Sequence, residues 1–144
     1  MNKMETNCNG KYTDSLRDYG REVFKRYGYK CIYCEQDFSS KEMWLFLTVE
    51  HVIPLFMKVD LESLSWFKTD PKILKSIVNL RPACRFCNGL RNKDSYSDYL
   101  DKDSFEDSVR NVLDIKKKMI GEKRGEYLEF YQNCVTQDML TMRR

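Results

Sequence analysis

The sequence of 144 residues contains a single histidine, His51, and lacks both internal repeats and low-complexity linkers. It has no hydrophobic run near the roughly 20 residues that a membrane-spanning helix needs, so we expect no membrane association. The first 14 residues include no hydrophobic stretch, which argues against a signal peptide. From these absences we expect one domain over residues 1–144 in a reducing, cytoplasmic compartment.

The composition that is present is typical of a globular chain with one modest core, with 42% hydrophobic and 13% aromatic residues. The net charge of +3 permits binding to nucleic acid without requiring it. The basic side chains are unevenly spread, and a cluster falls within residues 81–93: Arg81, Arg85, Arg91 and Lys93.

Four of the six cysteines form two CxxC pairs, which are Cys31 with Cys34 and Cys84 with Cys87. Each CxxC turn presents two thiolates to one side, so two turns can complete a tetrahedral zinc site. A disulfide framework would suit a small secreted protein, and redox chemistry needs only one CxxC pair, so both alternatives are less favoured. We expect structural zinc at these residues, Cys8 on the surface, and Cys134 facing the core.

The apolar pattern predicts a helix over residues 14–27 that ends at Gly28, and a strand over residues 43–53 limited by Pro54. His51 therefore falls near a strand end. Two short helical pieces are predicted within residues 60–78, followed by an extended segment at 79–82.

The second CxxC pair is predicted to open a helix that carries Asn88 and Arg91 on one face. A capping box at Ser104 predicts the start of another helix, which we expect to end at Gly121. Apolar residues at helical spacing then predict a second helix, so that residues 101–144 form a C-terminal helical hairpin.

The order of these elements resembles the HNH endonuclease family: a CxxC pair, Glu50-His51 at a strand end, Asn79, and a CxxC pair followed at once by Asn88. The matching segments are YGYKCIYC, VEHVIP and NLRPACRFCNGLRNK, within residues 21–94. The resemblance implies an α+β fold with a ββα-metal core over about residues 21–100. A zinc knuckle, an N-terminal helix and the C-terminal hairpin would complete it.

The resemblance also implies a divalent-metal-dependent enzyme that hydrolyses DNA phosphodiester bonds to a 5′-phosphate and a 3′-hydroxyl. His51 matches the general base, a role that suits an imidazole near pH 7. Asn79 matches the residue that holds the catalytic histidine in orientation, commonly through a backbone carbonyl. Glu50 and Asn88 match the two protein ligands of a catalytic Mg²⁺ or Mn²⁺. By the same analogy, Arg91 and Lys93 face the DNA backbone.

The sequence departs from the family pattern at Glu50, where the family usually has Asp or His. Glutamate keeps the charge and ligand type but adds a methylene, and Mg²⁺ tolerates little geometric error. Taken alone, each residue also has an ordinary interpretation. A lone His51 suits a structural histidine, Asn79 a turn or cap, Asn88 a polar knuckle residue, and Arg91 and Lys93 a solvated helix face.

Two alternative functions follow from the same residues. One is a non-catalytic zinc module that binds nucleic acid or protein. The other is the nuclease subunit of a bacterial or phage-encoded defence or restriction complex, inactive without its partner. Because one active site makes one cut, the C-terminal helices are where we expect a homodimer contact or a protein partner.

Overall fold

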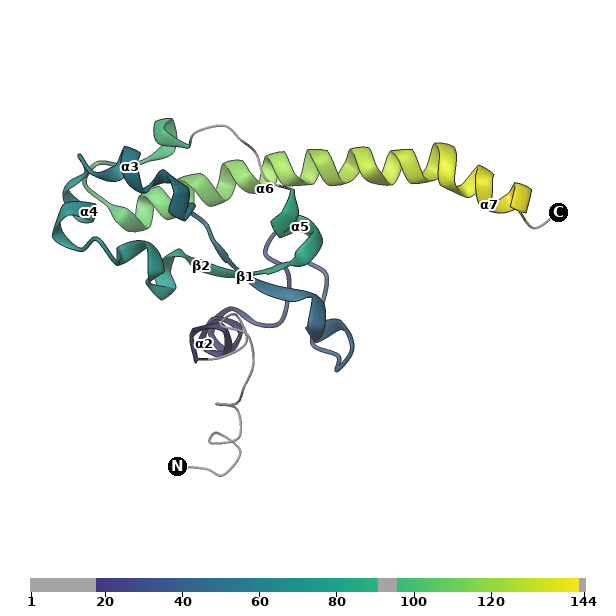
Figure 1. Ribbon diagram of the computed structural model, residues 1–144, viewed down its shortest axis with the longest axis horizontal. Helices are drawn as coiled ribbons and strands as arrows, with labels where there is room; N and C mark the ends of the chain where they lie inside the picture. Colours follow the sequence, from purple (N-terminus) through teal and green to yellow (C-terminus); the bar gives the residue numbers. More distant parts are fainter. Residues whose placement is uncertain (1–17, 91–95, 143–144) are drawn as a thin grey trace, which may run out of the picture.

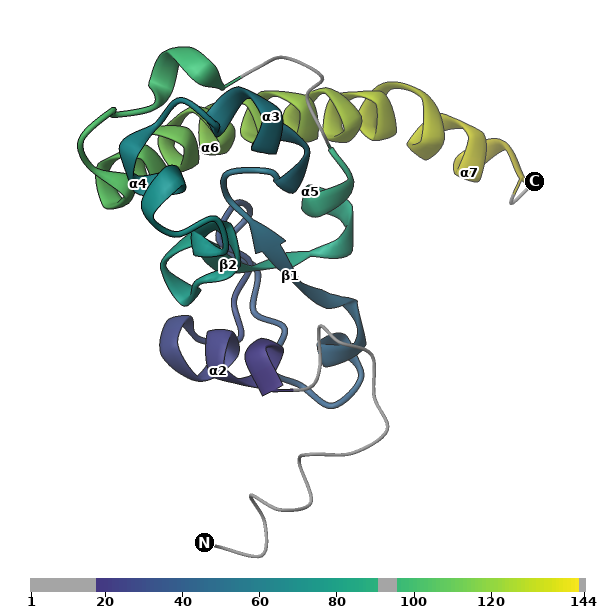
Figure 2. The same ribbon diagram turned by 60° about the vertical axis from the view of Figure 1, so that its left-hand side comes forward.

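The computed structural model describes residues 18–90 and 96–142. Within them the fold is α+β, with short and long helices around a small two-stranded antiparallel sheet (Figure 1). Helix α2 lies on one side of the sheet and the long helix α6 on the other (Figure 2). This sandwich places the strand that carries Glu50 and His51 between two helical layers.

The sheet is formed by β1 (Leu47–His51) and β2 (Leu80–Cys84), with His51 paired to Leu80 and Leu47 paired to Cys84. His51 is the last residue of β1, as the sequence predicted. The start of the predicted strand was wrong, because Met43–Phe46 form a 3-10 helix. The Ser40 hydroxyl accepts a hydrogen bond from the Met43 N–H over 3.3 Å, and this local contact favours a turn over an extended chain.

Helix α2 (Asp18–Tyr27) packs against the sheet through Val23 and Phe24, which are buried. Gly28 ends it with a φ of 90°, a conformation that only glycine adopts without strain, and its N–H donates to the Phe24 carbonyl over 2.8 Å. The predicted end of this helix is confirmed. Its predicted start at residues 14–17 lies outside the described residues.

The chain between the strands forms five short helical pieces over residues 55–79, so the helical character predicted for residues 60–78 is confirmed, while the predicted number of two pieces is wrong. They are 3-10 Leu55–Met57, α3 (Lys58–Leu61), α4 (Ser65–Thr69), 3-10 Ile73–Lys75 and 3-10 Ile77–Asn79. Their apolar side chains pack against the first half of α6 as one core cluster. A second cluster lies under α2, the strands and the CxxC turns, and α6 contributes Ile120 to it.

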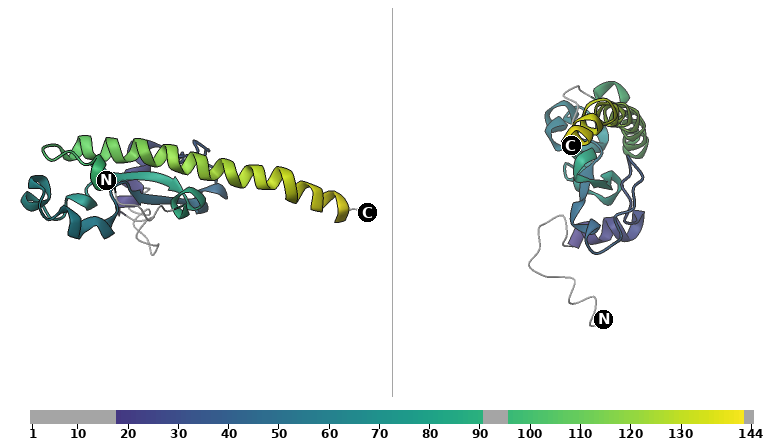
Figure 3. Two further views of the ribbon diagram at one scale, coloured as in Figure 1. Left: turned by 90° about the horizontal axis from the view of Figure 1, so that it is seen from above. Right: turned by 90° about the vertical axis from the view of Figure 1, so that its right-hand side faces the viewer.

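After β2 the chain forms α5 (Arg85–Gly89), then α6 (Phe105–Phe130), a π-helical turn (Tyr131–Val135) and α7 (Thr136–Met142). These last three segments run as one continuous rod (Figure 3), so the predicted C-terminal hairpin is wrong. Gly121 lies inside α6 without a positive φ. One glycine reduces helix stability by only about 1 kcal/mol, which is too little to end a helix without further turn residues.

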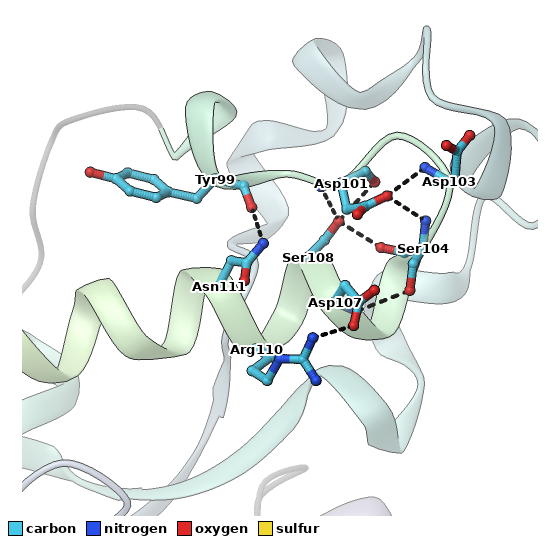
Figure 4. A network of polar contacts seen from close by, with 8 residues as sticks. All are labelled: Tyr99, Asp101, Asp103, Ser104, Asp107, Ser108, Arg110 and Asn111. Atoms are coloured by element: carbon cyan, nitrogen blue, oxygen red, sulfur yellow. Dashed lines mark hydrogen bonds and ion pairs between the residues drawn. The ribbon is translucent and has the colours of Figure 1, made fainter.

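The start of α6 is fixed by a dense capping network (Figure 4). The Ser104 hydroxyl accepts from the Asp107 N–H over 3.1 Å, as the capping box predicted, and the Asp101 carboxylate accepts from the Ser104 N–H over 3.0 Å. Ser108 is fully buried, and its hydroxyl accepts from the Asp101 N–H over 2.7 Å. This network sets the rotation of α6 and therefore which of its side chains meets the sheet.

The second half of the rod projects beyond the rest of the molecule (Figures 1 and 3). Cys134 is exposed there, so the prediction that it faces the core is wrong, while Cys8 lies outside the described residues. Although α6 is long, neither it nor any other helix in the described part of the chain is apolar enough to cross a membrane. Large apolar side chains are exposed along the projecting part: Tyr127, Leu128, Phe130, Tyr131, Met139, Leu140 and Met142.

Candidate active site and four-cysteine metal centre

The four CxxC cysteines lie together, as predicted. The sulfur atoms of Cys31, Cys34, Cys84 and Cys87 are all within 4.8 Å of one another, and those of Cys34 and Cys84 are 4.0 Å apart. Four thiolates around one Zn²⁺, with Zn–S bonds of about 2.3 Å, have sulfurs separated by roughly 3.8 Å. Four cysteines arranged in this way could hold a metal ion such as zinc.

Each pair of cysteines is shaped by a tight turn. The Cys34 N–H approaches the Cys31 sulfur at 3.5 Å, and the Cys87 N–H approaches the Cys84 sulfur at 3.4 Å. In the first turn Glu35 takes a φ of 61°, which lets the chain double back towards Cys31. A hydrogen bond of 2.9 Å from the Ile32 N–H to the Pro82 carbonyl then ties the first turn to β2.

The thiols of the cluster differ strongly in their acidity. A hydrogen bond with Cys84 lowers the pKa of Cys31 to about 4, and the same contact raises the pKa of Cys84. Burial raises the pKa of Cys87 to about 12. Without a cation, the Cys31 thiolate is therefore stabilised by its hydrogen bond with Cys84. A bound metal would favour the loss of the remaining protons, because thiolates are the ligands.

Three of the predicted catalytic residues line one cavity of about 360 Å³ beside this cluster. Glu50 and His51 enter it from the end of β1, and Asn88 enters it from α5. The remaining wall is formed by β1 and the segment after it, by α5 and the residue that follows it, by Tyr96 and by α6. It includes Val49, Pro54, Leu55, Phe56, Cys87, Leu90, Tyr96, Lys116 and Ile120.

The His51 ring is half-buried, and its pKa is lowered first by burial and then by the positive charges of Lys116 and Lys75. All three effects disfavour the imidazolium form. The ring makes no hydrogen bond with the described residues. A neutral imidazole at the edge of a cavity is chemically suited to accept a proton from water.

Asn79 is fully buried and lies outside the cavity wall. Its side-chain oxygen accepts from the Ile53 N–H over 2.8 Å, and its amide donates to the carbonyls of Ile53 and Leu74 over 3.0 and 2.8 Å. Its own carbonyl accepts from the Val52 N–H over 2.8 Å. Asn79 thus fixes the two residues that follow His51, and none of these hydrogen bonds goes to the imidazole ring.

Glu50 is buried and paired with a residue that the sequence analysis missed. Its Oε1 accepts from Lys116 Nζ over 3.1 Å, while Oε2 and the Tyr33 hydroxyl are both buried without a hydrogen bond of normal geometry. Burial raises the pKa of Glu50 although Lys116 opposes this effect, and burial together with Glu50 raises the pKa of Tyr33. The carboxylate thus lies between an ammonium and a phenol.

Asn88 is oriented by the start of α5, which Cys84 caps. Its amide nitrogen donates to the Thr48 hydroxyl over 2.9 Å, and Thr48 in turn donates to the Ala83 carbonyl over 2.7 Å. These contacts hold the side chain on the same side of the sheet as Glu50. The amide oxygen of Asn88 accepts no hydrogen bond from the described residues and can act as a cation ligand.

Arg91 and Lys93 lie outside the described residues, so their predicted contact with DNA remains a prediction. The helix that was predicted to bring Asn88 and Arg91 to one face ends at Gly89. That helical argument for Arg91 is therefore wrong, because α5 is two residues too short.

Lys116 carries a signal that the sequence analysis overlooked. The buried stripe of α6 runs through Val109, Val112, Lys116 and Ile120, each three or four residues after the one before. A lysine at a core position of such a stripe is unusual, because burying an ammonium is unfavourable unless it is paired. Tyr33 had no comparable signal, since a tyrosine within a CxxC pair is ordinary in sequence.

No protein-family model matches the chain, and comparison with curated proteins and with solved structures finds no significant match. The assignment of this cavity therefore depends on its own residues, their geometry and the resemblance of their order to the HNH pattern.

Proposed function

We propose that the protein is an HNH-type endonuclease that hydrolyses DNA phosphodiester bonds with the help of a divalent cation. The observation that carries the proposal is the convergence of Glu50, His51 and Asn88 on one cavity beside a four-cysteine cluster. These residues come from two elements far apart in sequence, β1 and α5. In this proposal β1, β2 and α5 form the ββα-metal core, and the cysteines hold structural zinc.

His51 is the general base in this proposal. Its lowered pKa keeps the ring neutral at physiological pH, so it can take a proton from a water molecule that attacks phosphorus. Asn79 acts as a positioning residue, because its hydrogen bonds to Ile53 fix the backbone just after His51. That constraint keeps the ring at the cavity edge while substrate binds.

Glu50 and Asn88 are the residues that would hold Mg²⁺ or Mn²⁺. The donor set fits in type, since Glu50 Oε2 is a buried carboxylate oxygen without a hydrogen bond of normal geometry from the described residues, and the Asn88 amide oxygen accepts none from them. A divalent cation bound there would supply charge neutralisation at the scissile phosphate and at the leaving 3′ oxygen. Glu50 Oε1 already accepts a hydrogen bond from Lys116, so a metal ion that binds Glu50 must compete with this ammonium group.

DNA is the proposed partner, and contact with its phosphates is assigned to Arg91 and Lys93. A cytoplasmic setting fits a substrate of this kind and thiols that must stay reduced for zinc. Any partner at the C-terminal rod would bind its exposed apolar side chains.

The experiment that tests the proposal is cleavage of supercoiled plasmid by zinc-loaded protein in EDTA, Mg²⁺ or Mn²⁺. We expect cleavage only with the added divalent ion, and a loss of at least about 100-fold in His51→Ala, Glu50→Gln and Asn88→Ala. Two matched controls, Asn111→Ala and Glu126→Gln, change exposed residues on α6 and should cut at the wild-type rate. Equal cutting by His51→Ala and wild type would exclude His51 as the base.

A non-catalytic zinc module is the second candidate, and the pairing of Glu50 with Lys116 favours it. In that case Glu50 is a structural partner of α6 and not a metal ligand. A folded, zinc-loaded protein that binds DNA fragments but cuts no DNA with Mg²⁺ or Mn²⁺ would support this alternative.

A further inference from the structure

One buried ion pair forms part of the cavity wall next to His51. Lys116 donates to Glu50 Oε1 over 3.1 Å and approaches the His51 carbonyl oxygen at 3.4 Å. The side chains of Lys116 and Glu50 are only 8% and 9% exposed. We propose that Lys116 is an internal cation that competes with the divalent metal for the Glu50 carboxylate and thereby sets the metal affinity of the site. This inference rests on the proposed function.

The surroundings of the Lys116 ammonium are those of a cation site. A carboxylate oxygen and a backbone carbonyl oxygen lie within hydrogen-bond distance, and the face of the Tyr96 ring lies 5.4 Å from the nitrogen. Carboxylate and carbonyl oxygens are also the ligands that Mg²⁺ and Mn²⁺ prefer. The same oxygens therefore suit either the ammonium or a metal ion.

Two cations close to one carboxylate repel each other strongly, most of all in a buried setting. A divalent ion ligated by Glu50 therefore either displaces the ammonium or binds beside it with reduced affinity. Glu50 is the only carboxylate among the described residues of the cavity wall. Asn88 is neutral and cannot supply a second negative charge. With one negative charge available, the Lys116 ammonium and a divalent ion compete for the Glu50 carboxylate.

The position of Lys116 on α6 argues against a purely structural role. Val112 and Ile120, one turn before and after it, are both buried and apolar. A buried ion pair often contributes no more stability than apolar residues of similar size. An apolar side chain at position 116 would continue the stripe, whereas the lysine places a positive charge beside the one carboxylate that the described residues contribute to the cavity wall.

The test measures Mn²⁺ binding to the zinc-loaded full chain from the electron paramagnetic resonance signal of the free ion. We expect Lys116→Met to bind Mn²⁺ at least about tenfold more tightly than wild type. Lys117→Met is the matched control, because it removes the same charge from an exposed position of the same helix and should leave the affinity unchanged. Glu50→Gln should abolish Mn²⁺ binding both in the wild-type chain and in the chain with Lys116→Met.

Thermal unfolding with and without Mn²⁺ gives a second readout. Lys116→Met leaves Glu50 without its ammonium partner, so the melting temperature of this variant should be lower than that of wild type. Mn²⁺ should raise the melting temperature of the variant by more than it raises that of wild type. Lys116→Gln, which keeps a neutral hydrogen-bond donor, should bind Mn²⁺ more tightly in the same way.

Equal Mn²⁺ affinity in wild type, Lys116→Met and Lys116→Gln would overturn the inference while leaving the metal centre in place. Weaker binding by both lysine variants would also overturn it, since Lys116 would then support the metal. Failure of both variants to fold at saturating Mn²⁺ would count equally against it, because bound metal should replace the missing charge. Absence of Glu50-dependent binding in every protein would instead remove the proposed metal centre itself.

Discussion

At the level of single residues, the charge of His51 controls the proposed chemistry. A general base works in its neutral form, and burial, Lys116 and Lys75 lower the pKa of His51 below its ordinary value of 6.5. The cleavage rate should therefore rise with pH and reach half its maximum below pH 6.5. The pH dependence of single-turnover plasmid cleavage measures this midpoint.

A matched pair of lysines tests the electrostatic cause of that midpoint. Lys75→Ala removes one of the charges that lower the pKa of His51, so the midpoint should move to higher pH at low salt. Lys72→Ala removes an equally exposed charge that does not act on His51 and should leave the midpoint unchanged. A midpoint above pH 7 in wild type would contradict the environment described for this ring.

The residues of the cavity could be predicted from sequence to different degrees. Glu50, His51 and Asn88 were predicted to act together from their order along the chain, and they line one cavity. Lys116 was missed because its partner is 66 positions away, and only the packing of α6 on β1 brings them together. A pattern along the chain reports local spacing, whereas this ion pair depends on tertiary packing.

At the level of elements, the continuity of α6 through Gly121 can be tested by substitution. No atom outside the helix backbone lies within 4 Å of a Cβ built at Gly121, and its φ is not positive. Gly121→Ala should therefore stabilise the protein by about 0.4–1 kcal/mol, because alanine loses less backbone entropy on folding. Gly28→Ala should instead destabilise it by roughly 1–2 kcal/mol, since its φ is 90°. Urea unfolding of both variants measures the difference in the free energy of unfolding. A destabilised Gly121→Ala variant would contradict a continuous helix at Gly121 and favour the predicted hairpin.

The CxxC turns are the elements that a bound zinc ion would stabilise most. Cys34→Ser removes one of four sulfurs, so zinc should be lost, with a decrease of more than about 3 kcal/mol in the free energy of unfolding. Cys134→Ser changes an exposed cysteine far from the cluster and serves as the control. Zinc content by atomic absorption and urea unfolding give the two readouts. A Cys34→Ser protein that retains one zinc per chain would contradict the four-cysteine site.

At the level of the whole molecule, the CxxC turns and the cavity share one framework. The second CxxC pair starts α5, which carries Asn88, and the first is tied to β2, which pairs with the strand of Glu50 and His51. Sequence patterns predicted the end of β1, an extended segment where β2 lies, the meeting of the two CxxC pairs and the start of α6 at Ser104. They could not predict the direction of the chain after Gly121, because a projecting helix and a returning helix share the same apolar spacing. That distinction depends on whether the rest of the fold offers a surface to cover the apolar side chains.

Because residues 18–90 and 96–142 hold one candidate nuclease site, the proposed enzyme as a monomer should nick DNA before it makes a double-strand break. Supercoiled plasmid should first become the nicked circle, and linear DNA should appear only after a lag. A chain truncated after residue 131 loses, among residues 132–142, only side chains that are exposed or half-buried, so it should nick at the wild-type rate. Gel electrophoresis of a time course with both proteins measures this. Linear product without a lag from the full chain alone would show instead that the projecting rod brings two sites to one duplex.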